Sequence, residues 1–239
     1  MKVNWNNIKI LSLILLITGL YAFSEARSEG KTIADVNIDF NENDAPYITH
    51  AMVNKLLIQN YGSLTNVAKE NLDLNTIEKL ITKNEMVKSA EVYLTVNGEL
   101  KSKIAQRKPI GRIEGSEKFY MDEEGKMMPL SKNYSARVPI ITGKINEKNL
   151  EDVFTILKYS ATDDFLYKNI IGVHIAENDT YQLKFRLENF VVDLGKAKNL
   201  KGKFNNYKAF YIKANKDGSL PNFSKVSLEF ANQVVCTKI

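Results

Sequence analysis

The chain has little of the chemistry on which metal sites, disulfides and most active sites depend. Its 239 residues contain one cysteine, Cys236, and two histidines, His50 and His174. A lone cysteine excludes an intramolecular disulfide, and two distant histidines lack the ligand spacing of a zinc site. We predict that Cys236 is a small apolar strand residue, that His50 lies at an exposed helix start, and that His174 faces solvent from a strand. No metal or other cofactor is predicted.

The chain also has only a small excess of positive charge and lacks a phosphate-binding loop. Its 33 Lys and Arg and 28 Asp and Glu residues give a net charge of +5 and are mixed along the sequence. Nucleic-acid-binding proteins cluster their positive charge, so we predict no nucleic-acid partner. The segments "LGKAKNLKGK" and "KINEK" lack the spacing and the GK[ST] ending of a phosphate loop. Apolar residues at 44% and charged residues at 26% indicate an ordinary folded protein.

Two acidic clusters are the remaining candidates for catalysis. Asp122, Glu123 and Glu124 in "MDEEGK", and Asp163 and Asp164 in "ATDDF", could serve acid–base chemistry or bind calcium. The first cluster lies on an expected hairpin turn and the second between a helix and a strand, where such residues collect for backbone reasons. We therefore predict turn and capping roles for both clusters and no enzymatic activity.

The N-terminal segment is apolar and uncharged. No charged residue occurs in residues 10–24, and Trp5 and Tyr21 lie near its two ends, where interfacial aromatic residues occur in membrane helices. The segment is short for a span of about 20 residues unless it is counted from Trp5. A cleaved signal peptide is the alternative, since "AFS" at residues 22–24 resembles a small-x-small cleavage site. Both interpretations place the rest of the chain outside the cytoplasm.

The next segment carries the pattern of a compact α+β unit. "TIADVNIDF" reads as a strand, and a helix with one apolar stripe is expected from Thr49 to a stop at Gly62. A second helix is expected to begin at Asn75, which can cap it together with Glu78. Strands on either side of Asn97-Gly98 predict a hairpin with a type I′ turn. The order strand, helix, helix, strand, strand predicts two helices on one face of a small sheet.

A strand-rich second unit is expected beyond Pro109, because proline removes a donor from a strand ladder. Short strand patterns separated by Gly and Asn-Asp turns follow, together with two helices around residues 150–157 and 204–211. We find no internal repeat and no low-complexity tract.

The final segment, "VSLEFANQVVCTKI", reads as one more strand. Ser227 and Glu229 alternate with Leu228 and Phe230, which is the period of a half-buried strand. A strand that arrives last can lie at a sheet edge with one row of backbone groups unpaired. Taken alone, the pattern also fits ordinary core residues on an edge that needs no partner.

Three stretches, taken in order, resemble the bacterial cell-division family FtsQ, called DivIB in some lineages. The first runs from "VNIDF" to "IAQRKPIGRI" and is similar to the family's POTRA domain and its Arg-x-Pro element, here Arg107-Lys108-Pro109. The second, "FYMDEEGKMMPLS", is similar to the hairpin that opens the family's β domain, with Tyr120, Asp122 and Gly125. The third comprises "FVVDLGKAKNLKGKFNNYKAFY" and the final "KVSLEFANQVVC".

The resemblance implies an α+β protein in three parts. Residues 1–31 would hold a short cytoplasmic tip, a transmembrane helix and a linker, residues 32–105 a POTRA domain, and residues 106–239 a mostly antiparallel β domain with two helices. It implies a single-pass inner-membrane protein with its bulk in the periplasm at the division septum. Such a protein is a divisome scaffold without catalytic activity that helps to recruit late septation proteins.

The resemblance also implies partners. In this family the β domain binds FtsB, which pairs with FtsL, and FtsB adds a strand to the last strand of the sheet. The family often has arginine where this chain has Glu229, so we expect a basic FtsB residue opposite it. Phe230 replaces the usual tyrosine and keeps an aromatic surface without the hydroxyl. The implied partner-binding positions are Ser227, Leu228, Glu229, Phe230, Asn232 and Val234.

Two other functions stay open at this point. POTRA domains also occur in assembly or secretion factors that chaperone client polypeptides, although such factors carry further POTRA repeats or a membrane barrel, which this sequence does not show. A secreted hydrolase released by cleavage near Glu25 is the third possibility, and it lacks a catalytic pattern.

Overall fold

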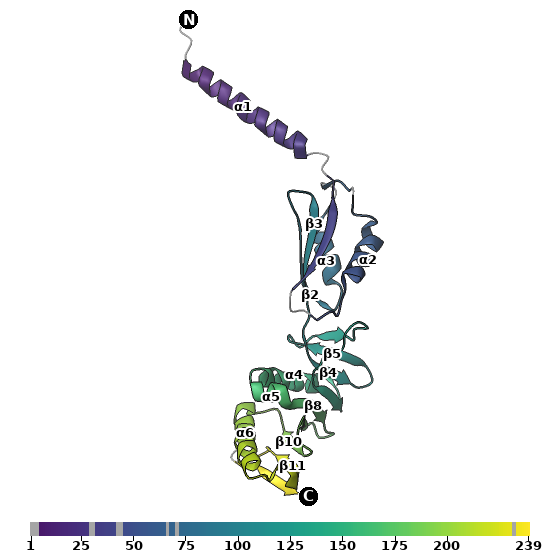
Figure 1. Ribbon diagram of the computed structural model, residues 1–239, viewed down its shortest axis with the longest axis vertical. Helices are drawn as coiled ribbons and strands as arrows, with labels where there is room; N and C mark the ends of the chain where they lie inside the picture. The colour runs from purple at the N-terminus through teal and green to yellow at the C-terminus, as the bar shows by residue number, and fades with distance from the viewer. Residues whose placement is uncertain (1–4, 29–31, 42–44, 66, 70–71, 231–232) are drawn as a thin grey trace. The chain divides into compact units, whose positions relative to one another are not determined.

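The computed structural model describes residues 5–28, 32–41, 45–65, 67–69, 72–230 and 233–239. It divides into two compact units (Figure 1). Unit 1 comprises residues 1–44 and 48–106, and unit 2 comprises residues 45–47 and 107–239.

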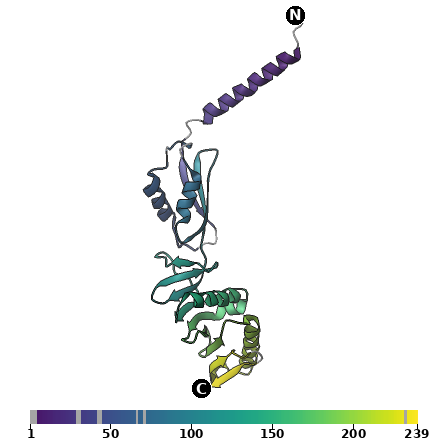
Figure 2. The same cartoon turned by 180° about the vertical axis from the view of Figure 1, so that it is seen from behind.

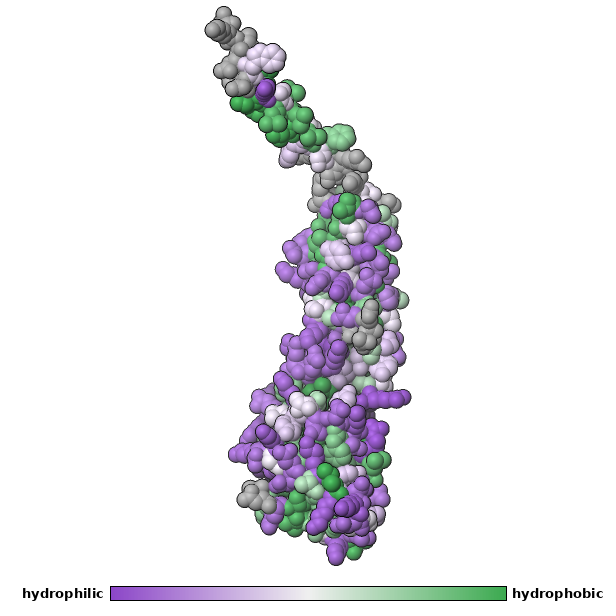
Figure 3. Space-filling model, turned by 60° about the vertical axis from the view of Figure 1, so that its left-hand side comes forward, coloured by the Kyte–Doolittle hydropathy of each residue, from purple (hydrophilic) through white to green (hydrophobic). Residues whose placement is uncertain are grey.

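Helix α1 (Trp5–Ser28) comes first in the chain and exposes apolar side chains along its length. In Figure 3 these side chains form a green, hydrophobic stretch of surface. Among the described residues, no helix, α1 included, combines the length and the apolar character that a membrane crossing requires. The predicted transmembrane helix therefore stays a prediction.

The rest of unit 1 has the predicted order of elements: β1 (Asp35–Phe40), α2 (His50–Tyr61), α3 (Leu74–Thr82), β2 (Val87–Leu94) and β3 (Glu99–Gln106). The sheet order is β1-β3-β2, with β1 parallel and β2 antiparallel to β3. Along β3, Leu100 and Ile104 are buried and Lys103 between them is exposed. The two helices bury their apolar stripes on this one face of the sheet (Figures 1 and 2), as predicted.

The ends of the two helices differ from the prediction in one case. Helix α2 begins after Thr49, whose Oγ1 accepts the Met52 N–H at 3.3 Å, and ends at Gly62 with a φ of 71°, as expected. Helix α3 is capped by Asp73 and not by Asn75, because the Asp73 carboxylate accepts two backbone N–H groups, at 3.0 and 3.3 Å. A carboxylate is as good a cap as an amide, and Asn75, two positions later, already lies within the first turn of the helix.

The turn between β2 and β3 is not of type I′. That turn needs a positive φ at both central residues, and Gly98 has a φ of 90° whereas Asn97 does not have a positive φ. The Gly98 N–H donates to Thr95 O at 3.0 Å, and the Thr95 N–H donates to Glu99 O at 2.9 Å. These hydrogen bonds close a loop of three residues, 96–98, which is one more than predicted, and only Gly98 takes the conformation that requires glycine.

The described strands of unit 2 form one nine-stranded sheet in the order β12-β11-β10-β9-β8-β7-β4-β5-β6. Five of its ladders are antiparallel, and three, β10–β11, β7–β8 and β4–β7, are parallel. The elements are β4 (Pro109–Glu114), β5 (Lys118–Asp122), β6 (Met127–Pro129), β7 (Ile140–Gly143), α4 (Glu147–Ala161), α5 (Asp164–Asn169), β8 (Ile170–Ile175), β9 (Tyr181–Phe185), β10 (Val191–Gly195), α6 (Leu200–Lys216), the 3₁₀ turn η2 (Leu220–Asn222), β11 (Phe223–Ser227) and β12 (Val235–Lys238).

Helices α4, α5 and α6 pack against one face of this sheet (Figures 1 and 2). Along β9, Tyr181, Leu183 and Phe185 are buried, whereas Lys184 is exposed, so the opposite face is open. The prediction of two helices missed α5, which has six residues and is too short for a helical period to show in the sequence.

The acidic clusters serve the backbone, as predicted. Asp122 is buried, accepts the Glu124 and Lys126 N–H groups at 2.9 and 2.8 Å, and pairs with the Arg107 guanidinium at 2.7 Å. Asp163 caps α5, and its hydrogen bond with Lys208 lowers the pKa of its carboxyl group.

The two histidines also lie as predicted. His50 is exposed at the start of α2, and His174 is exposed on β8 with its Nδ1 3.1 Å from Thr142 Oγ1.

Candidate functional site

The C-terminal segment forms two strands and not one. Strand β11 ends at Ser227 and pairs on both sides: Val226 lies opposite Val192 of β10 and opposite Cys236 of β12. The predicted single edge strand is therefore wrong, because β11 is an interior strand: β12 runs antiparallel to it and pairs with it from Phe223 to Ser227. Alternation of period two reports that one face of a strand is buried, and an interior strand with helices on one face shows the same pattern as an edge strand.

The open edge of the described sheet at this end belongs to β12, the outermost strand in the order. Successive residues of a strand point their backbone groups to opposite neighbours. The Leu228 N–H donates to Asp193 O of β10 at 2.8 Å, so the residues next to it on either side, Ser227 included, face β12. Val235, the register partner of Ser227, therefore directs its N–H and C=O groups to β11, whereas Cys236 directs its N–H and C=O groups to the open side.

The side chains of β12 are mostly exposed. Val235 is 42% exposed and Ile239, just beyond the strand, is 89% exposed. Cys236 is half-buried, and burial raises the pKa of its thiol. The Ile239 N–H donates to Asn222 O at 3.0 Å, which fixes the end of the strand. A short edge strand with a fixed C-terminal end and exposed apolar side chains is a suitable template for a further strand.

The six predicted partner-binding residues separate into different environments. Leu228 is 1% exposed and belongs to the core, and Val234 packs against that core. Ser227 is half-buried in β11, and Asn232 lies outside the described residues. Glu229 and Phe230 are exposed, and Phe230 is 49% exposed. Glu229 and Phe230 therefore offer the side chains most accessible to a partner.

The charge of Glu229 is already partly balanced within the chain. Glu229 lies against Gly195, the last residue of β10: a Cβ added there would be 2.8 Å from Glu229 Cγ. Burial lowers the pKa of Lys203, and a 2.6 Å pair with Asp193 raises the pKa of Lys225. The nearby Glu229 carboxylate favours the charged form of both lysines. A basic partner residue opposite Glu229 would compete with these two lysines.

Both units of the chain match known protein families. The family described as "FtsQ/DivIB, C-terminal related" matches residues 108–237, which is more than half of the chain. The chain belongs to the FtsQ/DivIB family. A POTRA-like domain matches residues 32–105. The recognised family is thus the one that the sequence resembles, and its members are bacterial cell-division proteins.

A solved structure in the same family is also similar to this chain. It is the major extracytoplasmic domain of the trans isomer of the cell-division protein DivIB from Geobacillus stearothermophilus, with 11% identity and a TM-score of 0.33 over 47% of this chain and 97% of that one. At that TM-score the likeness adds nothing to the family match. No curated protein matches the chain.

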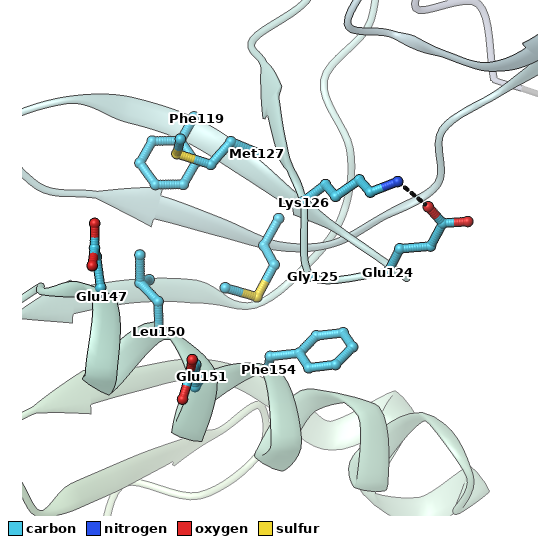
Figure 4. A pocket seen from close by; sticks show the side chains of 10 residues that line it. Phe119, Glu124, Gly125, Lys126, Met127, Glu147, Leu150, Glu151 and Phe154 are labelled. Carbon is cyan, nitrogen blue, oxygen red and sulfur yellow. Dashed lines mark hydrogen bonds and ion pairs between the residues drawn. The ribbon is translucent and has the colours of Figure 1, made fainter.

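A pocket on this FtsQ/DivIB protein lies at the other end of the sheet, between the β5–β6 hairpin and α4 (Figure 4). It encloses about 350 Å³ and is lined by apolar side chains that include Phe119, Leu150 and Phe154. Glu147 and Glu151 project from α4 at its rim, in the same close view. No group of three or more His, Cys, Asp or Glu side chains in the described part of the chain could hold a metal ion.

The edge strand β12 is the element of this region that the sequence analysis missed. Its signal was the polar pair "NQ" before the apolar stretch Val234–Cys236. A strand of four residues is too short for its alternation to be distinguished from that of the preceding strand. The sequence pattern therefore predicts one long strand where the structure has two.

Proposed function

We propose that this protein is a non-enzymatic scaffold of the bacterial divisome that binds FtsB and FtsL by strand addition to β12 and thereby helps to recruit late septation proteins. Family membership supports the cell-division role. The observation that supports the mode of binding is the outward backbone of Cys236 on an edge strand with exposed apolar neighbours. An outermost strand leaves one row of backbone groups unpaired, and such an edge can accept a strand from a partner.

The size of the edge sets what the side chains must contribute. A strand of four residues directs the backbone groups of about two of them outward. Each added hydrogen bond contributes only about 0.5–1.5 kcal/mol net. Exposed apolar groups next to the edge, such as those of Phe230, Val235 and Ile239, would have to supply much of the remaining affinity.

Cys236→Pro is expected to weaken binding of the extracytoplasmic FtsB–FtsL complex by about tenfold or more. Proline removes the N–H that points to the open side and places its ring where a partner carbonyl would approach. The β11–β12 ladder keeps its own donors, because Val235 and Thr237 supply them. Isothermal titration of the detergent-solubilised full chain with the FtsB–FtsL complex of the same organism measures the change.

Cys236→Ala is the matched control, since it removes the thiol and keeps the N–H, and it should bind as the wild type does. Thermal unfolding of both variants checks that the edge is intact. Equal affinity for Cys236→Pro and Cys236→Ala would contradict strand addition at β12. Deleting residues 226–239 is not a usable test, because it removes Val226 and Leu228 from the core.

We also propose that α1 holds the chain in the inner membrane, with the two units in the periplasm. The uncharged residues 10–24 and the exposed apolar side chains of α1 support this location. Leu13→Arg/Ile17→Arg should move the chain into the supernatant of an alkaline carbonate extraction, since each charge costs about 2.5–3.5 kcal/mol in a membrane.

Leu13→Ala/Ile17→Ala is the matched control for that extraction and should stay in the membrane pellet. A wild-type chain that is released by carbonate, with a mature N-terminus near Glu25 by mass spectrometry, would show cleavage of a signal peptide and contradict anchoring.

A further inference from the structure

A groove in unit 2 lies apart from both the edge strand and the pocket of Figure 4. Its volume is about 1000 Å³. Ligand pockets for small molecules span about 300–1,000 Å³, so this groove is large enough for several side chains of a peptide segment. It is formed where three parallel strands that are neighbours in the sheet begin, at Pro109 of β4, Ile140 of β7 and Ile170 of β8.

The groove is positively charged. Four cationic side chains line it, from Lys108, Arg137, Lys168 and Arg186, and none of its lining residues is acidic. Lys168 pairs at 3.2 Å with Asp164, an exposed residue of α5 outside the lining. Helices α4 and α5 end at the groove, and a helix C-terminus carries at most about half a negative charge. With Lys168 paired to Asp164, the guanidinium groups of Arg137 and Arg186 still outweigh these two partial charges.

The floor of the groove is apolar. Residues from β4, β7, β8 and the ends of α4 and α5 contribute it, and two large side chains are left open to solvent: Tyr167 is 68% exposed and Ile140 is 46% exposed. A free anion or a single carboxylate would use the cations but not this floor. A protein segment with an apolar anchor between acidic residues would use both.

We propose that this groove binds an acidic segment of a partner protein, with an apolar side chain on the floor and carboxylates against Arg137 and Arg186. The groove is separate from the proposed strand-addition edge. Strands β8 and β12 are four places apart in the sheet order, and at about 4.8 Å per strand this is about 19 Å. One partner on β12 would leave the groove free, so the two surfaces can hold different segments.

The test uses the full chain in phosphatidylcholine nanodiscs and three short fluorescein-labelled peptides. The first has Leu and Phe anchors flanked by Asp and Glu, the second has Lys in place of the acidic residues, and the third has Ser in place of the anchors. Fluorescence anisotropy should show binding of the first peptide only. Arg137→Glu/Arg186→Glu should weaken it about tenfold or more, and Tyr167→Ser should weaken it without a change in charge.

Lys213→Glu/Lys216→Glu is the matched control, because it makes the same change in net charge at two exposed positions of α6. This control should bind the first peptide as the wild type does. Equal losses in both double variants, or equal binding of the lysine peptide, would overturn the proposal. Failure of every peptide to bind would overturn it too.

A lipid alternative is distinguished in the same system. If no peptide binds, and phosphatidylglycerol vesicles sediment the wild-type nanodiscs but not those with Arg137→Glu/Arg186→Glu, the groove recognises lipid headgroups and the proposal is wrong. Binding of FtsB–FtsL to Arg137→Glu/Arg186→Glu should be unchanged. A failure of the groove proposal can therefore be distinguished from a failure of strand addition at β12.

Discussion

Gly143→Ala is expected to destabilise unit 2 by about 4 kcal/mol or more and in practice to prevent its folding. Gly143 is the last residue of β7 and has a φ of 98°, which side chains of L-amino acids rarely adopt. A Cβ at this position would lie 2.0 Å from the carbonyl oxygen of Ile175 in the neighbouring strand β8. That oxygen also accepts the Lys144 N–H at 3.0 Å, so it cannot move away without breaking the β7–β8 ladder.

Gly218→Ala separates the overlap from the backbone strain. Gly218 also has a positive φ, of 65°, but no atom lies within 4 Å of an added Cβ. It should cost only the strain of the left-handed region, about 1–2 kcal/mol. Urea unfolding of both variants, followed by circular dichroism, measures the difference. If Gly143→Ala loses no more stability than Gly218→Ala, the close approach of β7 and β8 is not as described.

Predictions from local sequence patterns succeeded where one residue decides one conformation. Thr49 caps α2 and Gly62 ends it because a hydroxyl next to free N–H groups and a residue without a Cβ each solve a local problem. The order of elements in unit 1 follows from such signals. Asp73 took the cap expected of Asn75 because its carboxylate accepts the N–H groups of Asn75 and Thr76, which places Asn75 inside the helix.

Pairing between strands could not be predicted in the same way. The register that makes β11 interior and β12 the edge depends on which strand lies beside which, and the hydrophobic period is identical for both arrangements. The basic groove is a stronger case. Its strands begin at Pro109, Ile140 and Ile170, far apart in the sequence, and only the parallel β4–β7–β8 arrangement brings their starts together. Of its four cationic lining residues only Lys108 belongs to a basic stretch of the sequence, "QRKPIGR", and the other three are far from it.

The stability of unit 2 is expected to fall by about 3 kcal/mol between pH 10 and pH 11, because three tyrosines are buried and protonated in the fold. Burial raises the pKa of Tyr47 to about 12, and it raises the pKa values of Tyr181 and Tyr207 further. An unfolded chain ionises its tyrosines near pH 10. Above that pH the unfolded state therefore holds fewer protons than the folded one, and the free energy of unfolding falls as the pH rises. Burial lowers the pKa of Lys203, so this one group changes the free energy of unfolding in the opposite direction.

Tyr207→Phe tests the origin of this pH dependence. The Tyr207 hydroxyl is buried and has no hydrogen-bond partner among the described residues, so the ring without it should be more stable at pH 8, by about 1 kcal/mol. The variant should also lose about one third less stability between pH 10 and pH 11, because one of three titrating groups is gone. Urea unfolding at pH 8, 10 and 11 and constant ionic strength measures both effects. The same alkaline loss in Tyr207→Phe and wild type would show that exposed lysines, and not buried tyrosines, cause the unfolding.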